Sequence, residues 1–202
     1  AGSRFMWFSE RNILRIGRTE SNYWDSSFSG DNSIVFGYSG VGQGDASLVT
    51  GGFYNEVFGD SSIIIGGSDN QIYGQDSVIV GGEKNRISSS NSIILGGMQN
   101  RASKDAMVLG GFENKSYGQG AIVSGFQNIV TGDDSIVFGG SNHELNANGA
   151  IAFGQKTRAH SGHDNVVLFG LSDLFTDSVV SSSVQIQVDH GVGINRTPSS
   201  DY

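Results

Sequence analysis

The stretch SIIIG, from Ser62 to Gly66, decides the fold of this chain because close copies of it recur at a fixed spacing. Each copy has a small residue, two aliphatic residues, a fourth residue that is usually apolar, and a glycine. The nine copies begin 14 or 15 residues apart, at Ser33, Ser47, Ser62, Ser77, Ser92, Ala106, Ala121, Ser135 and Ala150. Such a short period is typical of a solenoid, whose coils are too small to fold alone and must stack. The sequence therefore predicts an all-β rod of nine coils.

The alternation of side chains in a strand makes both faces of each copy apolar. In SIIIG, Ile63 and Ile65 lie on one face and Ile64 lies on the other. A strand that is apolar on both faces is expected to be covered on both. One face can line the inside of the coil, but 14 or 15 residues leave no chain to cover the other. We therefore expect further copies of the chain to cover it in a closed homo-oligomer.

The remaining residues of each coil predict two turns and a second strand. An asparagine occurs nine residues into five coils, where its tolerance of positive φ suits a tight bend, at Asn55, Asn70, Asn85, Asn100 and Asn114. An acid or amide precedes the next copy in many coils, at Asn32, Asp76, Asn91, Asp105, Asp134 and Asp164. A row of carboxylates can bind calcium, but the alternating acid and glycine spacing of calcium-binding rolls is absent. The pattern favours Asx-type turns.

Composition excludes several classes of function. The 202 residues hold 31 glycines, one proline and no cysteine, so a disulfide framework and a thiolate zinc site are excluded. A net charge of −8 with no basic run argues against a nucleic acid partner. The longest apolar stretches are far shorter than the roughly 20 residues that cross a bilayer, so we expect no membrane insertion of this segment. The opening Ala-Gly-Ser without methionine predicts a processed chain or an excised fragment.

The runs SIVFG, SIIIG, SVIVG and SIILG, each followed by an asparagine bend, resemble the head repeats of trimeric autotransporter adhesins of the YadA-like type. The resemblance covers residues 33–164. It implies a left-handed parallel β-roll that associates side by side into an obligate homotrimer, without cofactors. The third position departs from the family's frequent alanine toward valine and isoleucine.

The flanking segments carry a weaker resemblance. Residues 4–37 resemble the segment that leads into such repeats in phage tail fibres and in mosaic adhesive trimer fibres of predatory bacteria. The ending HGVGINRTPSS, His190 to Ser200, is similar to the strand before an intramolecular chaperone domain in tail-fibre and tailspike proteins. We expect residues 1–32, with Trp7 and Trp24, to form an N-terminal cap that hides the first edge of the solenoid.

The repeat is expected to stop after Asp164, where Asn165 replaces the small residue and Phe169 stands where glycine is due. Residues 165–202 are then predicted to form a C-terminal cap and trimerising neck. The residues expected to cap the end are Leu171, Leu174, Phe175, Val179 and Val180, and those expected to form a half-buried strand are Val184, Ile186 and Val188.

No catalytic, cofactor-binding or metal-binding residues are assigned. His160 and His163 with Asp164, and His190 separately, are possible metal ligands, but the first group lies at a coil turn without an obvious fourth ligand, which favours a solvated turn. The acids lie in repeat turns and outer strands with no insertion to build a catalytic cleft. The candidates for ligand contact are aromatic residues outside the core run, which can stack on sugars or pack between coils: Trp24, Tyr54, Tyr73, Phe112 and Tyr117.

These features predict an extracellular fibre head or tip, on a cell surface or virion. It would attach to a glycan or envelope component of a host or prey cell. Three linked copies would give avidity without a strong single site. One alternative is a purely structural shaft whose receptor-binding element lies elsewhere. A second is a fibre-borne polysaccharide depolymerase, although such helices usually have longer coils and projecting loops.

Overall fold

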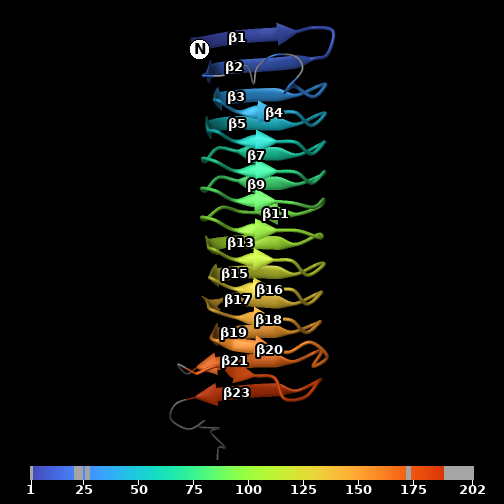
Figure 1. Ribbon diagram of the computed structural model, residues 1–202, viewed down its shortest axis with the longest axis vertical. Helices are drawn as coiled ribbons and strands as arrows, with labels where there is room; N and C mark the ends of the chain where they lie inside the picture. Colours follow the sequence, from blue (N-terminus) through green and yellow to red (C-terminus); the bar gives the residue numbers. More distant parts are fainter. Residues whose placement is uncertain (1, 21–24, 26–27, 172–173, 189–202) are drawn as a thin grey trace, which may run out of the picture.

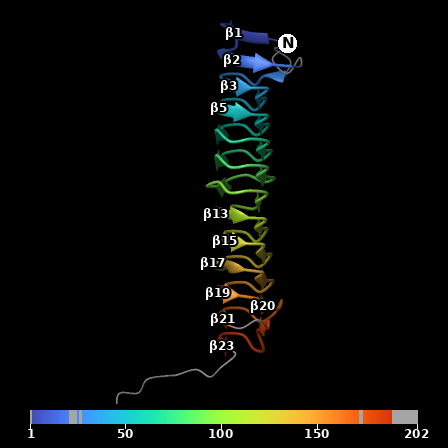
Figure 2. The ribbon, with the colours of Figure 1, turned by 90° about the vertical axis from the view of Figure 1, so that its left-hand side faces the viewer.

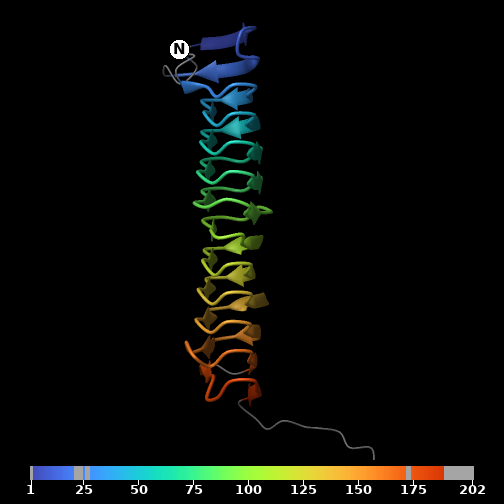
Figure 3. The same cartoon turned by 90° about the vertical axis from the view of Figure 1, so that its right-hand side faces the viewer.

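The computed structural model describes residues 2–20, 25, 28–171 and 174–188, and it forms a straight rod of stacked coils (Figure 1). The described residues contain strands and turns but no α-helix. Figures 2 and 3 show the rod from its two edges, where the chain passes back and forth between two walls. These walls are a long sheet of 13 strands and a short sheet of 10 strands. The all-β parallel roll predicted from the repeat is confirmed.

The long sheet takes one strand from every coil and extends beyond the coils at both ends. Its strands are β1 (Gly2–Phe8), β2 (Ile13–Thr19), β3 (Ile34–Tyr38), β5 (Leu48–Phe53), β7 (Ile63–Ile65), β9 (Val78–Val80), β11 (Ile93–Ile94), β13 (Met107–Phe112), β15 (Ile122–Phe126), β17 (Ile136–Ser141), β19 (Ile151–Gln155), β21 (Val167–Leu171) and β23 (Val184–Val188).

The short sheet takes the second strand of each coil. Its strands are β4 (Val41–Gly42), β6 (Glu56–Val57), β8 (Gln71–Ile72), β10 (Arg86–Ile87), β12 (Arg101–Ala102), β14 (Lys115–Ser116), β16 (Ile129–Val130), β18 (Glu144–Leu145), β20 (Thr157–Ala159) and β22 (Thr176–Asp177). Every pairing in this sheet is parallel and joins equivalent positions of successive coils, as where Arg86 lies beside Arg101.

Two columns of aliphatic side chains form the core between the sheets. The third residue of each copy points inward and is fully buried: Val35, Val49, Ile64, Ile79, Ile94, Val108, Val123, Val137 and Ala152. The short sheet contributes the facing column: Val57, Ile72, Ile87, Ala102, Val130, Leu145 and Ala159. The second and fourth residues of the copies therefore point away from the core.

The repeated asparagines lie inside the roll rather than at the bend. The left-handed backbone belongs to the residue before each of them, such as Gln99 with φ 58°. Asn100 itself is fully buried; its amide donates to the carbonyl of Gly111 at 3.0 Å and its oxygen accepts the backbone N–H of Asn114 at 3.0 Å. The prediction that these asparagines adopt positive φ is wrong, because a buried corner needs its backbone groups hydrogen-bonded.

Serines form a matching ladder at the opposite corner. Ser62 donates from Oγ to the carbonyl of Gly74 at 2.9 Å and accepts the backbone N–H of Ser77 at 3.1 Å. The residue before the small residue adopts left-handed backbone, as at Asp76 with φ 52° and Asp134 with φ 53°. The turns predicted before the copies are thus present, with a left-handed residue such as Asp76 or Asp134 at each of them.

The roll continues for another coil beyond Asp164, so the predicted stop at Asn165 is wrong. Asn165 has φ 58° and is the turn residue before a tenth copy, VVLFG, which begins at Val166. Gly170 pairs with Gly154 in the long sheet. The sequence pattern does not reveal this tenth copy, because the interval from Ala150 to Val166 is one residue longer than any earlier interval.

The C-terminal segment adds strands rather than a cover for the core. β23 confirms the strand expected at Val184, Ile186 and Val188, and it pairs in parallel with β21. Its expected half-burial is wrong for the single chain, because Val184 and Ile186 are 67% and 48% exposed. Of the residues expected to cap the end, Phe175 is half-buried and four are largely exposed, namely Leu171, Leu174, Val179 and Val180, at 57%, 67%, 73% and 55%. The segment that begins at His190 lies outside the described residues.

At the N-terminal end, β1 and β2 form an antiparallel hairpin that extends the long sheet. Ile13 and Arg15 of β2 are buried at the end of the core column. The Arg15 Nη2 donates to the carbonyl of Gly42 at 2.9 Å, and burial lowers the pKa of its guanidinium to about 10. Trp7, which was expected to cover this end of the core, is 53% exposed. Ile13 and Arg15 cover the end instead. Trp24 lies outside the described residues.

Candidate functional site

The outer face of the long sheet is apolar along most of its length, with Thr50 and Ser124 as polar interruptions. The second residue of each copy is at least partly exposed there: Ile34, Leu48, Ile63, Val78, Ile93, Met107, Ile122, Ile136, Ile151 and Val167. The fourth residues form a second column, and Ile65, Leu95 and Phe138 are 49%, 49% and 51% exposed. We call these two columns the apolar face.

The end strands extend this face instead of closing it. Ile186 of β23 lies in register with Phe169 and is 48% exposed. In the hairpin, Trp7 lies opposite Leu14, and Leu14 pairs with Ile34. Directly paired residues of neighbouring strands point to the same side of a sheet. Trp7 therefore belongs to the apolar face.

The outer side of the short sheet is polar and forms the opposite wall of the rod. Its first column has three bases in succession at its middle, and from β6 to β22 it reads Glu56, Gln71, Arg86, Arg101, Lys115, Ile129, Glu144, Arg158 and Asp177. The two glutamates of this column already have hydrogen-bond partners, since Glu56 accepts a hydrogen bond from Gln71 at 2.7 Å and Glu144 accepts one from Arg158 at 2.8 Å. We call this side the polar face.

Two of the predicted ligand-contact residues lie on the polar face. Tyr73 is 41% exposed, stacks on Phe58 with ring centroids 4.8 Å apart, and carries the Arg86 guanidinium 4.6 Å above its ring. Tyr117 is half-buried and lines an open groove with Arg86 and Arg101. These aromatic rings both pack between coils and present an exposed edge.

The other two described contact residues lie where a long-sheet strand ends, Phe112 as the last residue of β13 and Tyr54 directly after β5. Tyr54 has φ 53°, is 44% exposed, and contacts Tyr38 edge-on at 5.4 Å. Phe112 stacks on Phe126 at 5.3 Å. The structure therefore divides the four described candidates between the polar face and this region, and it does not gather those four into one pocket; Trp24 lies outside the described residues.

Sequence reasoning missed the basic residues of the polar face. Arg86, Arg101 and Lys115 occupy the same position in three successive coils and lie side by side in the sheet. Their shared position within the repeat is the signal that identifies them. They border two neighbouring grooves of ≈ 420 Å³ and ≈ 350 Å³.

The acidic corner of the rod has a structural explanation. The Asp45 carboxylate accepts the backbone N–H of Asp31 at 2.8 Å, and Asp133 accepts that of Gln119 at 2.8 Å. Such bonds cap exposed backbone groups from coil to coil. Within the residues that the structure describes, no three histidine or acid side chains converge as metal ligands.

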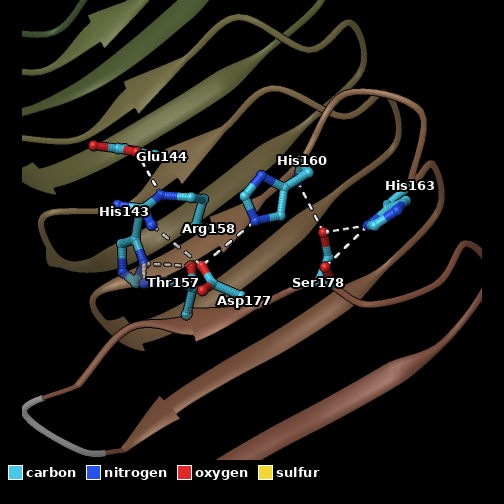
Figure 4. Close-up of polar contacts among 8 residues, drawn as sticks. All are labelled: His143, Glu144, Thr157, Arg158, His160, His163, Asp177 and Ser178. Carbon is cyan, nitrogen blue, oxygen red and sulfur yellow. Dashed lines mark hydrogen bonds and ion pairs between the residues drawn. The ribbon is translucent and has the colours of Figure 1, made fainter.

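His160 and His163 of the last coils contact each other edge-on, with ring centroids 6.0 Å apart, and each has its own polar partner (Figure 4). His160 lies 3.6 Å from Asp177, whereas the His163 Nδ1 lies 2.9 Å from the carbonyl of Ser178. His143 is buried, and burial lowers the pKa of its imidazole to about 4. The imidazole is therefore neutral at pH 7.

Comparison with known proteins adds one similarity. Residues 42–139, just under half of the chain, match the family model of the grass antifreeze beta roll. No curated protein matches the chain. Among the described residues, no helix has the length and the apolar character needed to cross a membrane. The matched range runs from β4 to β17, and the similarity agrees with the stacked coils in assigning a parallel β-roll repeat.

Proposed function

We propose that this chain is one subunit of a homotrimeric fibre segment that attaches to the surface of a target cell. The observation that carries the proposal is the division of the rod into an apolar face and a polar face on opposite sides of one thin core. If the apolar faces pack together, three polar faces point outward. Such a rod displays three parallel copies of one contact surface.

The apolar face needs a cover. Neighbouring strands lie about 4.8 Å apart and alternate residues of a strand about 7 Å apart, so the apolar face covers roughly 600 Å² when it is treated as flat. This area is at the upper limit of the apolar patches found on soluble monomers. Ile65, Leu95 and Phe138 are about half exposed in the single chain. Sister subunits can bury these side chains without distorting the coils.

The number three rests on the resemblance of the SIVFG-type copies to trimeric adhesin head repeats. A closed assembly also prevents the apolar face from recruiting further chains. We assign adhesion to the polar face because it carries Tyr73, Tyr117 and a row of cations. Three linked copies of a weak contact reach high avidity when they bind one surface together.

The similarity to the grass antifreeze beta roll favours a second candidate, ice binding by the long sheet. A face that matches a crystal lattice would need side chains of uniform size. In the fourth column the side chains range from Ser124 to Phe138, so the relief of this face is uneven. We therefore favour burial of this face by sister subunits over contact with ice.

The experiment combines solution mass with binding. Light scattering should give three times the 21.3 kDa chain mass, and the labelled trimer should bind at least one of a panel of bacterial and animal cells. A monomer would contradict the assembly. A trimer that binds none of the cells would favour a purely structural shaft, shortened glycans after incubation would favour a depolymerase, and growth arrest of ice crystals would favour the second candidate.

A further inference from the structure

The basic residues of the polar face form a strip of like charge that the chain itself does not neutralise. Arg86 pairs in register with Arg101, and Arg101 pairs in register with Lys115. Like charges placed directly opposite each other in a sheet are destabilising. Within the described residues, none of the three forms an ion pair with a carboxylate. We call these three residues the basic strip.

Acids lie at either end of the same column, yet none intervenes in the strip. Glu56 and Glu144 occupy the same position in other coils and are engaged by Gln71 and Arg158. Glu113 lines the groove beside Lys115, but its carboxylate accepts a hydrogen bond from Gln127 at 2.7 Å. The strip is therefore a bounded surface three coils long.

The strip borders three open grooves. The one beyond Lys115 holds ≈ 290 Å³ and includes Glu113 and Glu144 in its lining, and the other two share Arg101. One holds ≈ 420 Å³ and is lined by Lys84, Gln99, Arg101, Glu113 and Lys115. The other holds ≈ 350 Å³ and is lined by Arg86, Ser88, Arg101 and Tyr117. An extended chain laid along the rod would pass from one groove to the next and meet each cation in turn.

We propose that the basic strip binds a carboxylate-bearing, acidic polysaccharide that lies along the rod axis. The inference rests on the proposed function, because it assigns ligand chemistry to the polar face. Strands about 4.8 Å apart place successive cations at a spacing close to that of sugar rings in an extended polysaccharide. Arginine guanidinium groups bind carboxylates with two parallel hydrogen bonds. Tyr73 and Tyr117 offer ring surface for the apolar sides of the sugars.

The charge distribution favours an acidic polysaccharide over a nucleic acid. The chain carries a net charge of −8, and an acidic corner runs along the rod. A densely charged phosphate backbone needs a broad positive surface, and its binding increases with the number of phosphates that are neutralised. A strip of three cations suits a ligand with about one charge per sugar.

The test uses hexamers of galacturonate and of mannuronate, together with the same hexamers after chemical reduction of their carboxyl groups to alcohols. Calorimetry on the full chain should show binding of at least one acidic hexamer that weakens with added salt, and no binding of its reduced form. Arg101→Gln should weaken this binding about tenfold or more, as expected for loss of a charged hydrogen-bond donor. Lys104→Gln is the matched control, because it removes the same charge from the acidic corner and should change affinity less than about twofold.

Several results would overturn the inference. Equal losses in the two variants would mean that only net charge matters, and equal binding of the reduced hexamer would exclude carboxylate recognition. Tighter binding of a thymidine hexanucleotide would point to nucleic acid. If the wild-type protein binds cells and the triple variant Arg86→Gln, Arg101→Gln and Lys115→Gln binds them equally well, the basic strip is not the binding site, although the proposed adhesion stands. Hexamer binding without cell binding would support the strip and reject adhesion, and thermal unfolding checks that each variant is folded.

Discussion

At the scale of single residues, His143 shows how the internal ladder tolerates a change of side chain. In the preceding coil, Asn128 supplies an acceptor to the next coil, since its Oδ1 accepts the backbone N–H of His143 at 2.9 Å. The imidazole of His143 supplies a donor and an acceptor in the same way. Its Nε2 lies 3.1 Å from the carbonyl of Gly154, which only accepts, so Nε2 carries the proton and Nδ1 accepts from the Thr157 hydroxyl at 2.7 Å.

This geometry predicts loss of stability in weak acid. Burial lowers the pKa of His143 from 6.5 to about 4 in the folded chain. The unfolded chain therefore takes up the proton first, so the contribution of the neutral imidazole is complete above pH 6.5 and declines as the pH falls toward 4. Between pH 7.5 and pH 5 we expect a loss of about 2 kcal/mol in the free energy of unfolding.

The measurement is urea unfolding of the wild type and of His143→Asn at both pH values. The asparagine restores the side chain used in the earlier coils and has no proton to gain. Between pH 7.5 and pH 5, the free energy of unfolding of this variant should therefore fall by about 2 kcal/mol less than that of the wild type. Parallel pH curves for the two proteins would show that protonation of His143 carries no cost.

The residue scale also shows what could be predicted from sequence. The buried third position follows directly from the alternation of aliphatic residues, and it is confirmed at Ile64 and Ile94. The asparagines are harder, because an amide is equally suited to a left-handed turn and to an internal ladder. Only the coil path shows that Gln99 makes the turn while Asn100 turns inward. The pairing of Arg101 with Lys115 follows from their shared position in successive coils, whereas their place on the open side of the short sheet is shown only by the structure.

At the scale of the coil, two adjacent glycines have different tasks. Gly81 has φ 71°, but a side chain there would meet nothing closer than a carbonyl oxygen at 3.8 Å. Gly82 has φ 82°, and a Cβ there would lie 2.2 Å from the carbonyl oxygen of Gly97 in the next coil. The first glycine serves the backbone conformation, whereas the second also lets the coils approach one another.

The pair predicts unequal effects of the same substitution. Gly81→Ala should lower the free energy of unfolding by about 1 to 2 kcal/mol, the cost of a left-handed backbone with a Cβ. Gly82→Ala should lower it by about 4 kcal/mol or more, because neighbouring coils must separate. Urea unfolding of the two variants under identical conditions is the measurement. Equal losses at the two positions would mean that close approach between coils adds nothing.

The coil scale also explains why the end of the roll was misplaced. A fixed interval finds each copy only while turns keep their length, and the turn before Val166 is longer by one residue. The sheet tolerates the insertion, because Gly170 still pairs with Gly154. Pairing between coils, rather than spacing along the chain, defines the repeat in three dimensions.

At the scale of the whole molecule, the two faces impose different requirements on the same thin rod. The polar face is satisfied by water and by its own hydrogen bonds, as where Gln71 donates to Glu56. The apolar face runs from the hairpin to β23, and within the described residues only Thr50 and Ser124 place polar side chains in its two columns. Substitutions on these faces should therefore separate assembly from folding.

The last prediction concerns the double variant Ile65→Glu and Leu95→Glu. Both side chains are 49% exposed in the single chain, so two glutamates should leave each roll folded. In a trimer, the same substitutions would bury six like charges near one axis at a cost of several kcal/mol. Light scattering should then report single chains, while circular dichroism retains the β signal.

The matched control places glutamates on the polar face, at Gln43 and Thr131, both of which are exposed. This variant has the same change of charge and should keep the mass of the wild-type assembly, because its new carboxylates remain in water. If both double variants kept the same mass as the wild type, the apolar face would lie outside the subunit interface. Dissociation of the control alone would instead assign the interface to the polar face, and the proposed direction of display would be reversed.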